Sequence, residues 1–122
     1  MKFEKIDRGK GIVTAVLSEN EVIADVDSAL DLLMSAKDEA GAECIVVDKK
    51  QIAEEFFVLS TGLAGEILQK YINYGGKLAI YGDFSHYTSK PLKDFIRESN
   101  KGKDFFFAAT KDEAVKKLTE AI

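Results

Sequence analysis

Three short apolar runs, separated by segments of helical period, constrain the fold of this chain most strongly. The runs lie at residues 42–48, 78–81 and 105–108 and are rich in aliphatic and aromatic residues. Between them, apolar residues recur every three or four positions, which is the period of an amphipathic helix. A strand that returns to its sheet through a helix lies parallel to its neighbour. The sequence therefore predicts an α/β fold with helices packed on a largely parallel sheet.

The first 25 residues predict an antiparallel start to this sheet. Residues 3–6 and 13–17 are extended segments joined across Gly9 and Gly11, as in a β-hairpin. Residues 21–24 add a short third extended piece. Together with the later runs, these segments predict a mixed, mostly parallel sheet of about five strands, with about four helices packed on it. Because the 122 residues contain no linker or repeat, we expect one domain over residues 1–122.

Residues that cap helices mark the start of each predicted helix. Their side chains accept hydrogen bonds from the free backbone N–H groups of the first turn, and the candidates are Asp27 or Ser28, Ser60 or Thr61, Ser89, and Thr110. Glu113, three residues after Thr110, completes a capping box. Before the second helix, residues 52–57 predict a short helical or irregular bridge.

Charge and cysteine content limit the partners and the compartment. The formal net charge is −4 and the basic residues are spread along the chain, so no nucleic-acid partner is expected. Cys44 is the single cysteine and lies in an apolar run, where a small buried side chain is the usual interpretation. The amino terminus lacks the apolar core of a signal peptide, and no apolar run is long enough to cross a bilayer. We therefore expect a cytoplasmic protein with no membrane segment.

Hydroxyl and acidic residues gather in the loops that follow the predicted parallel strands. In open α/β sheets, ligands bind beyond the carboxyl ends of these strands. Two helix starts in these loops direct free amides, and hence partial positive charge, toward the same edge of the sheet. The candidate ligand-binding or partner-binding residues are Ser60, Thr61, Gly62, Asp83, Ser85 and Ser89. The alternative interpretation is structural, since the hydroxyls could serve only as caps and the glycines could only permit close packing.

The same loops do not predict a known catalytic or nucleotide site. Neither the Gly-x-x-x-x-Gly-Lys-Ser/Thr pattern nor the Gly-x-Gly-x-x-Gly pattern is present. Asp83, Ser85 and His86 are too close in the sequence for the spatial arrangement of a hydrolase triad. One histidine and one cysteine do not make a zinc site. We expect no metal and no cofactor, and a binding role is favoured over an enzyme.

The segment that opens the second predicted helix resembles the signature of STAS domains. The resemblance rests on residues 59–63, with the sequence Leu-Ser-Thr-Gly-Leu, on residues 67–71 and on Gly75-Gly76. STAS domains include the anti-sigma-factor antagonists and domains of sulfate transporters, and their motif reads Asp-Ser-Ser/Thr-Gly-Leu. The resemblance implies a STAS-like fold and makes Thr61 a possible phosphorylation site. Leu59 occupies the position of the acidic residue in that motif.

A second resemblance covers almost the full length of the chain. Residues 56–73, 78–89 and 94–104 are similar to a family of short bacterial proteins that is known only as a domain of unknown function. This resemblance implies family membership and brings no activity with it.

These features lead to two hypotheses that use the same rim of the sheet. The first is a regulatory or protein-binding module that works through the start of the helix near Thr61. The alternative is a sensor or binder of a small anionic or acyl ligand in the same crevice. Four aromatic residues could belong to the core or to a patch that faces a partner, namely Tyr71, Tyr74, Phe84 and Tyr87. The sequence is also compatible with the formation of a homo-oligomer.

Overall fold

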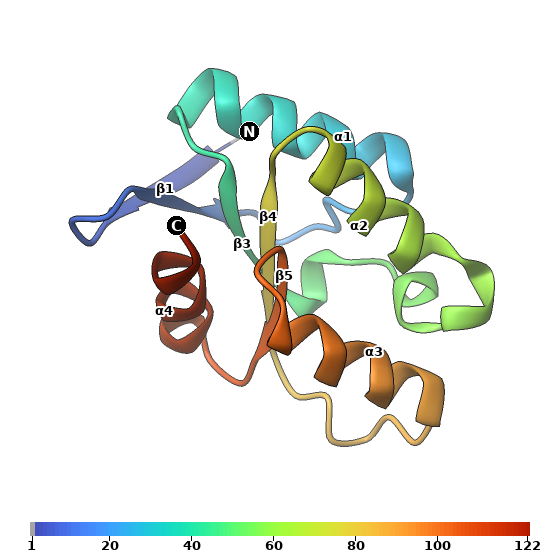
Figure 1. Ribbon diagram of the computed structural model, residues 1–122. Helices are drawn as coiled ribbons and strands as arrows, with labels where there is room; N and C mark the ends of the chain where they lie inside the picture. Colours follow the sequence, from blue (N-terminus) through green and yellow to red (C-terminus); the bar gives the residue numbers. More distant parts are fainter. Residues whose placement is uncertain (1) are drawn as a thin grey trace.

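The computed structural model describes residues 2–122, which form one five-stranded sheet in the order β1-β2-β3-β4-β5 (Figure 1). The strands are β1 (Lys2–Asp7), β2 (Ile12–Leu17), β3 (Cys44–Asp48), β4 (Lys77–Tyr81) and β5 (Phe105–Ala108). β1 pairs antiparallel with β2, and the remaining neighbours are parallel. The predicted mixed, mostly parallel sheet with a leading hairpin is confirmed. The third extended piece is not a strand, because Ile23 forms only an isolated bridge with Ile52.

Four α-helices cover the two faces of this sheet. They are α1 (Val26–Ser35), α2 (Leu63–Asn73), α3 (Lys90–Lys101) and α4 (Lys111–Ala121). The buried side chains of α1, α2 and α3 share one apolar cluster, whereas those of α4 belong to a second cluster on the other face. Figure 1 shows this division, with α4 on the side of the sheet away from the other helices. The α/β class and the expected number of helices are confirmed.

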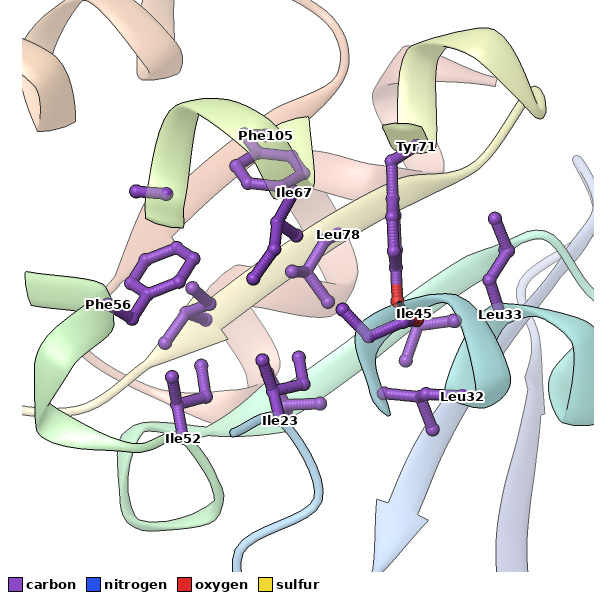
Figure 2. Packing of buried hydrophobic residues seen from close by; sticks show 14 of the residues in the cluster. Ile23, Leu32, Leu33, Ile45, Ile52, Phe56, Ile67, Tyr71, Leu78 and Phe105 are labelled. Atoms are coloured by element: carbon purple, nitrogen blue, oxygen red, sulfur yellow. Dashed lines mark hydrogen bonds between the residues drawn. The ribbon is translucent and has the colours of Figure 1, made fainter. Parts of the chain in front are cut away.

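The larger cluster fixes α1 and α2 against the centre of the sheet. Figure 2 shows Leu32, Ile67 and Tyr71 packed over β3 and β4. Tyr71 is fully buried, and its hydroxyl donates a hydrogen bond to the carbonyl of Ala29 at 2.7 Å. Tyr71 is therefore a core residue and does not face a partner. Burial raises the pKa of its phenol.

The first helix begins two or three residues earlier than expected. Asp25, not Asp27 or Ser28, is the N-cap, and its carboxylate accepts from the Ser28 amide at 2.8 Å. The Ser28 hydroxyl in turn accepts from the Asp25 amide at 3.0 Å, which completes a capping box. These hydrogen bonds hold the pKa of Asp25 below its usual value. Ser28 thus supports the cap from inside the helix.

The outer edge of β5 is closed by side chains of the two neighbouring helices. The Asn100 side-chain oxygen, from α3, accepts from the Phe107 amide at 2.8 Å. Glu113, from α4, accepts from the Ala109 amide at 3.4 Å. A strand edge that is covered in this way offers fewer free backbone groups to another chain.

Candidate functional site

A groove lies at the carboxyl edge of the sheet, between the segment that precedes α2 and the loop from β4 to α3. We call it the rim groove, and its volume is about 410 Å³. Its apolar part is formed by Phe57, Val58, Leu59, Pro91 and Leu92. Its polar part is formed by Glu54, Ser60, His86, Tyr87, Thr88 and Ser89. Half of the Val58 side chain remains open to solvent, with 47% exposure.

Short helical turns bring the first wall of the groove to this position. After β3, the chain forms three 3₁₀ segments, Lys49–Gln51, Glu54–Phe57 and Leu59–Thr61, before α2 begins. The buried rings of Phe56 and Phe57 attach this wall to the main apolar cluster. The predicted helical or irregular bridge therefore exists, and it places apolar and polar side chains on the groove.

Tyr87 contacts both aromatic and acidic side chains of the opposite wall. Its ring stacks on Phe57 with 5.3 Å between centroids, and its hydroxyl donates to Glu54 Oε1 at 3.0 Å. Burial, together with the hydrogen bond and the negative charge of Glu54, raises the pKa of Tyr87. The phenol therefore stays protonated and keeps its donor at neutral pH.

Lys49 ties the loop from β4 to α3 to the end of β3. Its ammonium group donates to the Asp83 carbonyl at 3.0 Å and lies 3.4 Å from His86 Nε2. The same Nζ lies 4.7 Å from the centre of the Tyr87 ring, within cation–π range. Lys49 therefore positions the second wall of the groove.

Gly82 makes this arrangement of Lys49 possible. Its φ is 153°, and a Cβ at this position would lie 2.8 Å from Cβ of Lys49. A side chain at residue 82 would therefore collide with Lys49 where it passes over the end of β4.

The hydroxyl of Thr61, just before α2, is hydrogen-bonded to backbone groups of the chain. Thr61 Oγ1 lies 2.8 Å from the Val58 carbonyl and 3.0 Å from the Glu55 carbonyl, to which it donates. It also accepts from the Leu63 amide at 3.2 Å. The N-cap of α2 is Gly62 with φ 77°, so neither Ser60 nor Thr61 holds the cap position that was expected. Within residues 2–122, the exposed Ser60 hydroxyl has no hydrogen-bond partner.

The six predicted site residues divide into three groups. Ser60 and Ser89 line the rim groove together, and the Ser89 hydroxyl also caps α3 by accepting from the Leu92 amide at 3.4 Å. Thr61 and Gly62 form the turn behind it. Asp83 and Ser85 form a separate turn, in which Asp83 Oδ1 accepts from the Ser85 amide at 2.9 Å. Hydrogen bonding to Ser85 lowers the pKa of Asp83. Asp83 lines a different hollow, beside α4.

Sequence reasoning missed the residues that hold the groove together. Lys49 is 37 residues from His86, and Glu54 is 33 residues from Tyr87, so no local pattern joins them. A signal was available only in the requirement for glycine at residue 82, directly after a strand.

Within residues 2–122, no group of three or more His, Cys, Asp or Glu side chains is arranged to hold a metal ion. Over the same range, none of the helices combines the length and the apolar character that a bilayer crossing requires. Cys44 is buried, and burial raises the pKa of its thiol.

Comparisons with known proteins give a family and a distant structural relative. The model of a domain of unknown function (DUF4180) matches residues 8–118. No curated protein that was compared with the chain matches it. Among solved structures, the chain is similar to a candidate anti-sigma factor antagonist from Thermotoga maritima, at 16% identity and a TM-score of 0.45. The alignment covers 95% of this chain and 93% of that chain. The family membership that the sequence predicted is confirmed.

Proposed function

We propose that this chain, which belongs to the DUF4180 family of domains of unknown function, is a regulatory protein-binding module whose binding site is the rim groove. The observation that carries the proposal is the half-exposed Val58 in the groove that the buried Phe57 and Leu92 also line. Covering exposed apolar surface in a groove with a partner lowers the free energy of the complex. We propose the cytoplasm as the compartment, which is consistent with a single buried cysteine.

The walls of the groove support this function because they are already held in place. The Tyr87–Glu54 hydrogen bond joins the two walls, and Lys49 fixes the loop that carries His86. Order that exists before binding reduces the entropy that a partner must overcome. Ser60 and Thr88 then offer hydroxyl groups at the edge of an apolar floor, as is usual for protein interfaces.

Thr61 is the proposed point of regulation. A phosphoryl group on Oγ1 would replace the hydrogen that is donated to the Val58 and Glu55 carbonyls. The phosphoryl group would also place roughly two negative charges next to these carbonyl oxygens. The turn that presents Val58 would then lose the hydrogen bonds that the Thr61 hydroxyl donates, and binding in the groove would weaken.

A pair of matched variants tests the binding proposal. Val58→Asp places a charge in the groove, whereas Met34→Asp places it on an exposed apolar position of α1, where the side chain is 39% exposed. We expect proteins captured from a bacterial lysate by the wild type to be lost with Val58→Asp and retained with Met34→Asp. Equal capture by all three proteins would contradict the proposal.

A small acyl ligand in the same groove is the second candidate function. The volume of about 410 Å³ and the apolar floor lie within the range of small-molecule pockets. Thermal denaturation with medium-chain fatty acids and with their alcohols tests it, because a true ligand raises the melting temperature by a few degrees. A shift that Val58→Asp does not remove would argue against this site.

A further inference from the structure

We propose that the rim groove selects a protein segment in which an apolar side chain stands next to a lysine or arginine. This inference rests on the proposed protein-binding function and adds the chemistry of the partner. The apolar side chain would cover Val58, and the cation would pair with Glu54.

The first observation is the charge of the groove itself. Among the side chains that line it, Glu54 carries the formal charge at neutral pH when His86 is neutral. One carboxylate oxygen, Oε1, accepts from the Tyr87 hydroxyl. Within residues 2–122, no cation forms an ion pair with Glu54, and Glu55 beside it is exposed. Within the described residues, the other carboxylate oxygen of Glu54 therefore has no hydrogen-bond donor or cation as a partner.

The second observation is that Lys49 and Lys90 already contact other groups of the chain. The Lys49 ammonium group contacts the Asp83 carbonyl, His86 and the Tyr87 ring. Lys90, at the start of α3, pairs with Asp94 at 2.7 Å. Neither lysine forms an ion pair with Glu54, so a counter-charge for the covered carboxylate would come from the partner.

Desolvation then decides which partner fits. A segment that covers Val58 also removes water from Glu54, because both line the same groove. Burying a carboxylate without a counter-charge is unfavourable in free energy, and a neutral or acidic segment would not offset this desolvation penalty. A lysine or arginine next to the apolar anchor pairs with the free oxygen and removes most of the cost. Charge of this kind favours the correct partner and rejects acidic ones.

Selection from a random dodecapeptide library on the full chain tests the inference. The variants are Glu54→Gln, which keeps an oxygen acceptor for the Tyr87 hydroxyl, and Val58→Asp. The control is Glu120→Gln, an exposed glutamate on α4. Melting temperatures establish that each variant is folded.

We expect the selected peptides to carry lysine or arginine within two positions of an apolar residue. Their affinity should fall about tenfold with Glu54→Gln and stay within about twofold with Glu120→Gln, and raised salt should weaken binding. Peptides that need Val58 but bind Glu54→Gln as tightly as the wild type would overturn this inference and leave the proposed function standing. A selection that yields no peptide dependent on Val58 would overturn the proposed function as well.

Discussion

The β5 edge and the rim groove differ in how much of their surface is left without contacts inside the chain. At β5, the Asn100 side chain accepts from the Phe107 amide, and the Glu113 side chain accepts from the Ala109 amide just after the strand. At the rim groove, Tyr87 donates to Glu54, and Lys49 contacts the Asp83 carbonyl and the Tyr87 ring. Val58 stays half exposed beside them. The difference is that hydrogen bonds occupy backbone amides at one place, whereas apolar surface stays exposed at the other.

The largest expected effect comes from closing the space that Lys49 needs. Gly82→Ala introduces a side chain at φ 153° and a Cβ 2.8 Å from Lys49, so we expect a loss of about 2–3 kcal/mol in the free energy of unfolding. Urea denaturation measures it. Gly65→Ala is the control, because no atom lies within 4 Å of the added Cβ and alanine favours a helix. A loss at residue 65 equal to that at residue 82 would contradict the role given to Lys49.

Removing the cover of β5 is the next largest change. Asn100→Ala leaves the amide of the buried Phe107 without its acceptor, which costs about 1–3 kcal/mol of stability. Asn100→Asp keeps an oxygen in place and should lose less. The measurement is again urea denaturation, combined with light scattering to detect new association along the strand. An Asn100→Ala protein as stable as the wild type would remove one half of the comparison.

The wall of the groove has a signature at high pH. The pKa of Tyr87 and of Tyr71 is higher in the folded chain than the usual value of about 10. Their contribution to stability is therefore complete below about pH 10 and is lost as the pH rises through the folded values. Tyr87→Phe should flatten part of this decline and lower stability at neutral pH by about 1 kcal/mol, through loss of the hydrogen bond to Glu54. Denaturation between pH 7 and 11 measures both effects, and an unchanged pH profile in the variant would contradict the assignment.

The smallest expected effect is that of Lys49 itself. Lys49→Met keeps the aliphatic part of the side chain and removes the contacts to Asp83 and His86, for an expected loss of about 0.5–1 kcal/mol. Amide hydrogen exchange should accelerate in residues 83–88 and stay unchanged in β5. Faster exchange in both regions would mean that Lys49 stabilises the whole fold and does not specifically hold the groove.

The sequence predicted the sheet well because strand and helix periods are local properties. The hairpin, the three parallel strands and the caps at Ser89 and Thr110 all follow from residues within a few positions of one another. Local rules failed at the first helix, where Asp27 or Ser28 was expected as the N-cap and Asp25 holds that position.

The candidate site was predicted only in part. Ser60 and Ser89 reach one groove because the carboxyl ends of parallel strands meet at one edge of the sheet. Val58 and Glu54 could not be found in this way, because their position depends on three short 3₁₀ turns that have no regular period. The contacts of Lys49 join segments more than 30 residues apart, and single-sequence patterns do not contain such pairings.

Site-directed photo-crosslinking in cells tests the central claim most directly. A benzophenone amino acid replaces Val58 in one protein and Met34 in another, so that each reports on the surface within a few ångströms of its own position. We predict discrete crosslinks to another protein from residue 58 and none of these from residue 34, and the crosslinks should fade when Glu54→Gln is added. Identical crosslinking patterns from both positions would contradict the assignment of the rim groove as the binding surface.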